Sequence, residues 1–553
     1  MNKYIKLLTL SGVLAGAAAC TDLDTPIEKF YVEFPNNPIA TEAEFNKCYH
    51  YLRNEGWLGR NFWETVFMFG DEAMAVNFQG NYFDNGRYFY CGVHDMRPDH
   101  MSGGQEVDLM SGMTVTNDVI RNYGGADGKD AIVAPLRAIR AFYMFLFMDL
   151  YGDTPIMDRK LDDGEVFERS PRADVARFIE QELLEIIPDL SEENNQGTYG
   201  TPNKWMAEAL LVKLYLNWGV YTNPIESVDN NTPNEKLADC VYWCDELINS
   251  GVFEVGQGYR RKFYPDNGLQ IKDFIYAMPF DPETLGNGYW GGWQPNRFWD
   301  FRSITLCEPA TWGWTPGEKP AGVFVMTPEA VDRFCLEGDE RNDMVAVGQM
   351  YGYDASFNKT DVPVMVYTDA RHRKEFGPLV YQKEFEFESI STFDVGAESD
   401  LNNLMKGARL FKYPPMEIDY MTGRWDKAGL QGNDFPIFRL ADIYLTKAEC
   451  ILRGAAATNG QSAADCINVV RDCASAPHIT NPTLQDVLDE RGRELIMEMW
   501  RRNDLIRFGQ FEDDWGWKNV VNPAAKTDKW RRLLPLSTGT MNTNTNWTQN
   551  PGY

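Results

Sequence analysis

The sequence predicts a mostly α-helical fold with a loop-rich segment inserted in the middle of the chain. Segments with the apolar spacing of amphipathic helices occur in the first half of the chain and again near its end, with short connections between them. From about Phe253 to Met416, glycine, proline, asparagine and aromatic residues are frequent and helical periodicity is weak, which is typical of loops and short strands. Consecutive helices at both ends suggest helical-repeat packing, although no clean repeat period can be read.

The composition of the chain excludes several classes of protein. Its 553 residues are 44% apolar and 24% charged, so the chain can bury a large core and is not intrinsically disordered. The formal net charge of −28 disfavours a nucleic-acid-binding protein, because such proteins need a basic surface against phosphate. Polyanionic ligands are disfavoured more weakly, since a local basic pocket can survive a negative total. The 16 tryptophans are a surplus that needs an explanation.

Residues 1–19 have the pattern of a lipoprotein signal peptide. Two lysines form a positive start and are followed by Leu7–Ala19, a run of apolar and small residues that is too short to span a bilayer. Small residues before Cys20 resemble the bacterial lipobox, in which Cys20 would carry acyl chains such as palmitate and become the first residue of the mature chain. Ala17 stands where that motif usually has leucine, and an ordinary secretory signal cleaved before Cys20 is the alternative.

Three helices are predicted in the first half of the chain. Leu136–Leu150 is apolar on nearly all sides, which predicts a buried helix, and Gly152 and Pro155 end it. Val175–Ile187 has amphipathic spacing. Lys204–Tyr221 follows a start signal and carries a row of large apolar residues along one face. These helices belong to a predicted helical scaffold at about residues 40–252 and 417–511, with the loop-rich insertion at about 253–416.

Three further amphipathic segments follow near the end of the chain, at Leu440–Leu452, Ala463–Ala474 and Leu484–Trp500. The last of them is rich in arginine between Glu490 and Glu494, which could suggest anion binding. Its charges alternate in sign at helical spacing, however, and this pattern favours a structural network of ion pairs.

The sequence carries no recognised catalytic motif. Its five histidines form no HExxH or HxH pair, and there is no GxSxG, Walker A or GxGxxG motif. With 81 acidic residues, carboxylate pairs of the kind that glycosidases use arise by chance and are not evidence of a hydrolase. We expect no enzyme activity, no cofactor and no metal. Glu512–Asp514 is interpreted as a solvated acidic turn, with a calcium site as the remote alternative.

Nine cysteines follow Cys20, an odd number that cannot be fully paired in an exported chain. They form no CxxC pair, so a zinc ribbon or a thioredoxin-like site is not supported. We expect most of them to be small buried thiols.

Five segments match, in order, the characteristic stretches of one protein family. They are Leu136–Pro155, Gly200–Leu216, Phe438–Glu449 continued by Ile467–Arg471, Glu490–Arg507 and Gln549–Tyr553. The first is similar to the pattern RAxxYFxLxxxYGDVPL, and the fourth is similar to the signature ERRREL followed by DLIRWG. Together, behind a lipobox-like start, they resemble the SusD/RagB family of surface nutrient-binding lipoproteins of Bacteroidetes. Asn503 departs from the pattern, since it stands near the usual aromatic residue.

The resemblance implies a mostly α-helical fold of tetratricopeptide-like helix pairs, in which an irregular, loop-rich inserted domain carries most of the ligand-binding loops. It also implies a lipid-anchored protein on the cell surface at the outer membrane, and a partner, a SusC-like TonB-dependent transporter. The implied role is to capture oligosaccharide or polysaccharide without catalysis. A peptide-binding member of the same family is one alternative, and a surface glycan hydrolase of unrecognised type is another.

Tryptophans gather in one stretch of the predicted insertion, and this stretch is the candidate glycan site. Glycines and prolines lie among them, so the stretch resembles a loop more than a core strand. Exposed rings suit sugars because the C–H groups of a sugar ring pack on an aromatic face, while nearby polar side chains bond the hydroxyl groups. The candidates, which include two residues of an earlier aromatic stretch and its surroundings, are Tyr289, Trp290, Trp293, Trp299, Asp300, Arg302, Trp312, Trp314, Tyr82 and Asp71. The alternative is that several of these tryptophans are buried packing anchors of an irregular domain.

Overall fold

The computed structural model divides into two compact units, Met1–Asn46 and Lys47–Tyr553, which we describe separately. The residues that it describes are 37–52, 66–75, 87–99, 104–162, 165–264, 266–280, 324–353, 359–363, 365–369, 374–386, 405–410, 412–413 and 433–553. In the first unit the described residues form the start of helix α2 (Pro38–Tyr51), where the side chain of Asn37 accepts a hydrogen bond from the Ala40 amide at 3.0 Å. The elements and contacts described next belong to the second unit.

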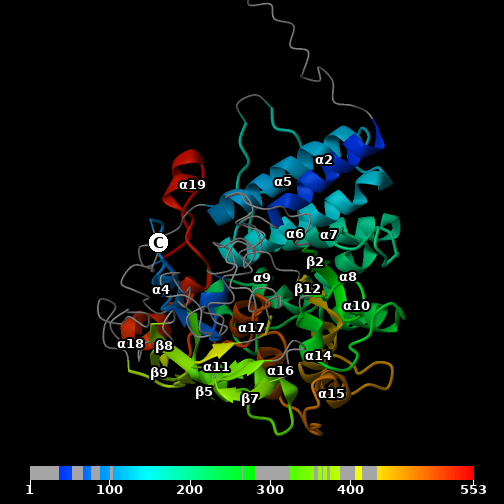
Figure 1. Ribbon diagram of the computed structural model, residues 1–553. Helices are drawn as coiled ribbons and strands as arrows, with labels where there is room; N and C mark the ends of the chain where they lie inside the picture. Colours follow the sequence, from blue (N-terminus) through cyan, green and yellow to red (C-terminus); the bar gives the residue numbers. More distant parts are fainter. Residues whose placement is uncertain are drawn as a thin grey trace, which may run out of the picture. The chain divides into compact units, whose positions relative to one another are not determined.

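Helices dominate the first half of the second unit. They are α4 (Arg87–Gly92), α5 (Gly104–Tyr123), α6 (Ala134–Tyr151), α7 (Arg172–Ile186), α8 (Lys204–Leu216), α9 (Trp218–Thr222) and α10 (Leu237–Asn249). Successive helices pack on each other, α5 on α6, α6 on α7 and α8 on α10, as Figure 1 shows for the blue-to-green part of the ribbon. The three helices predicted in this half are confirmed in position, and the mostly helical fold class is confirmed with them.

Helix α6 is the centre of this packing. All but two of its residues are buried, as the apolar pattern on nearly all sides predicts. Its two arginines stay inside because Glu182 of α7 accepts a hydrogen bond from Arg137 at 2.7 Å and another from Arg140 at 2.7 Å. By length and hydropathy alone the segment Ala131–Tyr151 would be able to cross a membrane, but 83% of its most apolar window is buried inside the protein, which marks it as a core helix.

The single helix predicted over Lys204–Tyr221 is wrong in one respect, because the chain breaks at Asn217 into α8 and α9. The side chain of Asn217 donates back to the Lys213 carbonyl at 2.9 Å, and its oxygen accepts from Arg507 at 2.8 Å. These two bonds compete with continuation of the helix, and the helix therefore breaks at Asn217.

The last part of the chain is helical again, with α14 (Leu440–Leu452), α15 (Ala463–Cys473), α16 (Leu484–Glu494), α17 (Arg501–Arg507), α18 (Lys518–Val521) and α19 (Thr538–Thr543). Helices α15 and α16 each begin with a capping box, formed by Ser462 with Asp465 and by Thr483 with Asp486. The helix predicted to run to Trp500 ends at Glu494 instead. Two methionines that follow have left-handed backbone angles, with φ of 61° and 70°, and such residues do not continue a helix.

Between the two helical parts the described chain forms short strands, as the sequence predicts. They are β2 (Phe274–Met278), β3 (Phe324–Met326), β4 (Val345–Ala346), β5 (Gly348–Gln349), β6 (Tyr351–Tyr353), β7 (Lys359–Pro363), β8 (Met365–Asp369), β9 (Lys374–Pro378), β10 (Val380–Tyr381) and β11 (Arg409–Leu410), with the short helix α11 (Pro328–Asp332) after β3. With β1 (Ala73–Ala75) and β12 (Phe435–Arg439) they pair as antiparallel two-stranded ribbons: β1 with β3, β2 with β12, β4 with β11, β5 with β10, β6 with β7 and β8 with β9. The limits of a separate insertion domain stay a prediction.

Buried ion pairs tie these strands to the late helices. Arg341, just before β4, donates to Glu490 at 2.7 Å and to Glu494 at 3.0 Å, both on α16. Arg439, at the end of β12, donates to Glu494 at 2.7 Å and to Asp273 at 2.6 Å. All of these side chains are fully or nearly fully buried. The charged run on α16 is therefore a structural ion-pair network, as its spacing indicates.

Candidate ligand site at the β1–β3 ribbon

The ribbon of β1 and β3 is where both predicted aromatic stretches join the described structure. Ala75 at the end of β1 lies opposite Phe324 at the start of β3. The chain continues from Ala75 into residues 76–86, which include Tyr82, and reaches Phe324 from residues 281–323, which include the tryptophans. The two stretches, although some 200 residues apart in sequence, therefore attach side by side at one register pair.

Most of the predicted site residues lie outside the residues that the structure describes. Those outside are Tyr82, Tyr289, Trp290, Trp293, Trp299, Asp300, Arg302, Trp312 and Trp314, together with the predicted lipidation residue Cys20. Their roles stay predictions. Asp71 is described, and it lies just before β1, where it helps to hold the ribbon in place.

Asp71 precedes β1 and is held by two arginines from distant elements. Its carboxylate accepts from Arg501 of α17 at 2.7 and 2.8 Å and from Arg333, after α11, at 2.7 Å. Only 7% of Asp71 is exposed. Burial alone would raise the pKa of this carboxyl, but the two guanidinium groups outweigh burial and hold the pKa well below its usual range. Asp71 thus fixes the start of β1 to α11 and α17.

Backbone bonds next to Asp71 lock β3 to β1. The Thr327 hydroxyl donates to the Asp71 carbonyl at 2.6 Å, and the Thr327 amide donates to the Glu72 carbonyl at 3.3 Å. The same threonine caps α11 by accepting from the Ala330 amide at 3.0 Å. The Glu72 side chain is buried beside Asp71, and burial followed by the negative charge of Asp71 raises its pKa to about 8. The start of the ribbon is therefore held by several bonds to neighbouring elements.

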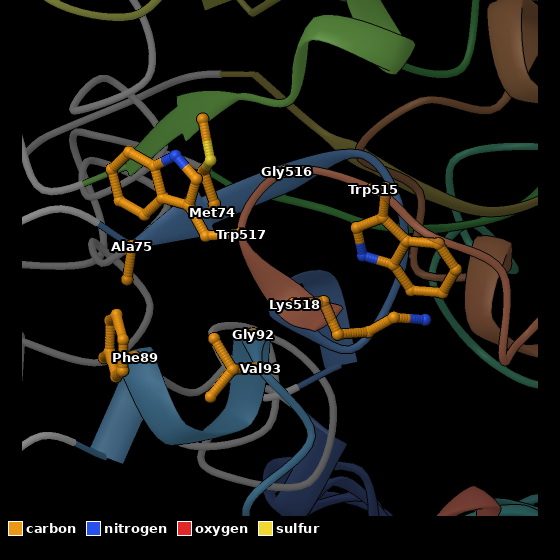
Figure 2. Close-up of a pocket in the computed structure, with 9 residues that line it drawn as sticks. All are labelled: Met74, Ala75, Phe89, Gly92, Val93, Trp515, Gly516, Trp517 and Lys518. Carbon is orange, nitrogen blue, oxygen red and sulfur yellow. The ribbon is translucent and has the colours of Figure 1, made fainter. Parts of the chain in front are cut away.

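A second support comes from the turn before α18. Figure 2 shows the indoles of Trp515 and Trp517 on opposite sides of Gly516, with Trp517 beside Met74 and Trp515 beside Lys518. Gly516 has a φ of +51°, a conformation that favours glycine, and a Cβ built on it would make a tight contact of 3.1 Å with the Met74 sulfur. The Trp-Gly-Trp turn thereby packs against β1.

Lys518 is part of this support. Its ammonium nitrogen lies 3.1 Å from the centroid of the Trp515 ring and donates to the Phe511 carbonyl at 2.9 Å. Burial lowers the pKa of Lys518 to about 7. The pocket between these residues and α4 has about 10 Å³ of free space, enough for one water but not for a sugar. This pocket is too small for a sugar, and its residues support the ribbon.

The described residues offer no metal site, since no cluster of histidine, cysteine, aspartate or glutamate among them is arranged to hold an ion. In the acidic run, Glu512 accepts from Arg532 at 2.7 and 2.6 Å, so it is paired, whereas Asp513 and Asp514 are exposed as predicted. Among the cysteines that the structure describes, Cys335 is exposed and the others are buried, which confirms the expectation for most of them.

Comparison with known proteins agrees with this architecture. Residues 317–553 match the SusD family model. The chain is 25% identical over 433 residues to the starch-binding protein SusD of Bacteroides thetaiotaomicron, covering 76% of this chain and 72% of that protein. The resemblance to the SusD/RagB family is confirmed. A SusD-like protein of Bacteroides ovatus is 25% identical over 520 residues, covering 92% of this chain and 83% of the relative.

Solved structures of SusD-like proteins share the fold. A laminarin-binding SusD-like protein superposes with a TM-score of 0.67 at 18% identity, covering 94% of this chain and 100% of that one. Surface glycan-binding protein A from Bacteroides thetaiotaomicron, solved in complex with laminarihexaose, has a TM-score of 0.67 at 17% identity and covers 93% of this chain and 99% of that one. The SusD-like fold class is thus confirmed across nearly the whole chain.

Sequence reasoning missed the residues that hold the ribbon in place. The arginine partners of Asp71 stand 262 and 430 residues away from it, and no local pattern indicates them. The turn at Trp515–Trp517 did have a signal, because it repeats the Trp-Gly-Trp of residues 312–314. A glycine between two tryptophans outside a strand pattern predicts a turn that separates two rings.

Proposed function

We propose that this protein is a cell-surface glycan-binding lipoprotein that captures oligosaccharide and delivers it to a TonB-dependent outer-membrane transporter of the SusC type. The observation that supports glycan capture most directly is the register pair of Ala75 and Phe324, which brings the attachment points of both aromatic stretches together. The names of the relatives, which describe starch and laminarin binding, support a glycan as the ligand.

The chemistry of capture follows from residue types. Aromatic rings such as Trp290 and Trp312 provide flat apolar faces for sugar rings, and Asp300 and Arg302 provide acceptor and donor groups for hydroxyls. A binding protein needs these groups held in place but needs no nucleophile or general acid. The ion pairs of Asp71 supply such a fixed base, because a carboxylate that is bonded to two guanidinium groups does not reorient.

Calorimetry on single Trp→Ala variants tests the site. The ligand is first identified on a glycan array, and variants at positions 290, 293, 299, 312 and 314 are then titrated with it. Loss of a stacking ring is expected to cost roughly 2–4 kcal/mol of binding free energy. Trp243→Ala on α10, which removes a half-buried indole paired with Tyr242 at 5.1 Å, is the matched control and should bind like wild type. Unchanged affinity in every folded variant of the five would place the ligand elsewhere.

Two further measurements separate the alternatives. A reducing-sugar assay on the purified protein is expected to show no release of sugar ends, and steady release would favour the hydrolase. A peptide array run beside the glycan array is expected to show no binding. Peptide binding without glycan binding would favour the peptide-binding alternative.

A further inference from the structure

A second hollow shares Met74, Gly516 and Trp517 with the small pocket of Figure 2. It is an open groove of about 470 Å³, within the range of about 300–1,000 Å³ that is typical of ligand sites. Its walls come from β1, α11, the segment after β10 and α18, and the residues that matter here are Met74, Glu384, Phe385, Glu386, Trp517 and Val520.

The floor of the groove is aromatic and apolar. The rings of Phe385 and Trp517 meet edge to face, with centroids 5.1 Å apart and planes at 88°. Phe385 is half-buried, and Val520 at the rim is 68% exposed. The turn that carries Trp517 is fixed because the Gly516 amide donates to Glu329 at 3.0 Å. Because these side chains are already held in place, stacking a flat apolar face on them costs little side-chain conformational entropy.

The rim of the groove is acidic. Glu384 and Glu386 flank Phe385 in sequence, and the Glu384 side chain is 75% exposed. The nearby Lys383 has two acidic partners, since it donates to Asp332 at 2.5 Å and lies 3.5 Å from Glu384. In a chain with a net charge of −28, this rim repels uronic acids and sulfated sugars. Carboxylates are also good acceptors for neighbouring sugar hydroxyls.

The groove adjoins the candidate glycan site along the chain. Met74 lines it, and the next residue, Ala75, is the point where the first aromatic stretch attaches. The groove therefore lies at the point where the first aromatic stretch joins the described structure.

We propose that the groove of Phe385 and Trp517 is a second carbohydrate subsite, which takes uncharged hexose units and rejects anionic ones. This inference rests on the proposed function and deepens it, because it states the charge class of the glycan. Phe385 provides the stacking edge, Trp517 holds Phe385 in position, and Glu384 and Glu386 accept hydroxyl bonds and exclude acidic sugars.

Fluorine NMR on the full chain labelled with 5-fluorotryptophan tests the subsite residue by residue. Loss of one signal in Trp517→Phe assigns the resonance of Trp517, and the five loop tryptophans are assigned in the same way. The probes are three uncharged glucose hexamers (laminarihexaose, cellohexaose and maltohexaose), hexagalacturonate and a hexalysine peptide. At least one glucose hexamer is expected to shift both the Trp517 signal and the loop signals, whereas hexagalacturonate shifts neither.

The two proposals fail in different ways. Shifts of the loop signals with a stationary Trp517 signal would overturn the subsite and leave the proposed function in place. A shifted Trp517 signal with stationary loop signals would support the groove and overturn the loop site. A Trp517 shift with hexalysine alone would make the groove a peptide site. No shift with any glucose hexamer or with the glycan identified on the array would overturn both proposals.

Variants test the roles within the groove. Phe385→Ala is expected to weaken binding of the active glucose hexamer about fivefold to tenfold, as loss of one aromatic contact does. Tyr242→Ala, which removes a 55% exposed ring on α10, is the matched control and should leave affinity unchanged. The double variant E384Q/E386Q keeps the shape of the rim, and it is expected to admit hexagalacturonate with a shift of the Trp517 signal. Continued exclusion of hexagalacturonate by that variant would overturn the role given to the two carboxylates.

Discussion

At the scale of single residues, the stability of the protein depends on its buried ionisable side chains. Some of them are paired with an opposite charge, and others are kept neutral by burial. Asp71 shows the paired case, with both carboxylate oxygens bonded to guanidinium groups. Glu208 on α8 shows the other case. It is fully buried, the Lys204 nitrogen lies 4.0 Å away, and neither carboxylate oxygen has a hydrogen-bond partner in the described structure. The two residues therefore respond to substitution and to pH in opposite ways.

Replacing Asp71 is expected to destabilise the protein strongly. Asp71→Asn leaves Arg501 and Arg333 buried without a counter-charge, and loss of one partner from a buried ion pair costs about 3–5 kcal/mol. Urea unfolding of the variant measures this loss. The control is Asp174→Asn, which removes the partner of Arg177 in a pair whose side chains are both 59% exposed and should cost under about 0.5 kcal/mol. Equal losses in the two variants would contradict the role of Asp71 as a structural anchor.

Glu208 is expected to make the protein less stable as the pH rises. Burial raises the pKa of Glu208 in the folded protein to about 7 from an unfolded value of 4.5. The stability linked to this group is fully present below pH 4.5 and is lost as the pH rises through about 7, because the folded state then has to bury a carboxylate. Glu72, with a pKa raised to about 8, adds a loss of the same sign.

Glu208→Gln removes that loss. At pH 8.5 the variant is expected to be more stable than wild type by about 1–3 kcal/mol, and near pH 4.5 the two should differ little. Thermal melts across this pH range measure the difference, with Glu226→Gln at an exposed position as the control. A difference that does not grow with pH would show that Glu208 is already compensated.

At the scale of elements, the β1–β3 ribbon is held by a third strand that approaches it closely. The Met326 amide of β3 donates to the Ala408 carbonyl next to β11 at 2.9 Å. Gly407 has a φ of +81°, and a Cβ there would lie 2.5 Å from Val325. Glycine at this position lets the chain before β11 lie against β3.

Gly407→Ala is expected to destabilise the protein by about 3 kcal/mol or more, because backbone strain and a clash with a β-branched side chain add together. Gly256→Ala separates the two effects. Gly256 has a similar φ of +71° but no atom within 4 Å of the added Cβ, so it should cost only about 1 kcal/mol. Urea unfolding of both variants checks the prediction, and equal costs would show that β3 and Gly407 are not in close contact.

Local patterns predicted the helices well and the contacts between distant segments poorly. Helix α14 has the predicted bounds because its apolar spacing is a local signal. The break at Asn217 was missed because one of its causes is Arg507, 290 residues away. The three-residue strands β1 and β3 are too short to show any period, so neither they nor their pairing was predicted. For the candidate site, the aromatic stretches were found from composition, whereas their common attachment point required the structure.

At the scale of the whole molecule, the N-terminal pattern predicts a lipid anchor. Cys20→Ala is expected to move the protein from the membrane fraction to the soluble fraction, because the acyl chains are the only attachment that the pattern predicts. Immunoblots of the fractions after a high-salt wash measure the change. Retention of the variant in the washed membranes would contradict lipid anchoring. Surface display has a separate test, and protection of the wild type from protease on intact cells would contradict it.

The proposed transporter partnership has its own test. Affinity purification from detergent-solubilised outer membranes is expected to bring down a barrel protein of transporter size together with this chain. Cys20→Ala expressed with the same tag serves as a control, since a protein that is no longer at the membrane should recover much less of the barrel. A purification that contains no protein of that size would count against the partnership.

Asp71 and its arginine partners are far apart in sequence, so folding around Asp71 can finish only after the late part of the chain has been synthesised. Glu106 accepts from the Ser537 amide, Asn522 donates to the His94 carbonyl, and Arg169 donates to Asn550, so early and late parts of the chain meet repeatedly. During synthesis the early segments therefore remain without these partners until the last part of the chain has emerged. A nascent chain that stops before residue 501 carries the charge of Asp71 without Arg501, its counter-charge on α17. We expect proteases to degrade such a chain, and premature termination near the end should abolish the protein as completely as termination near the beginning.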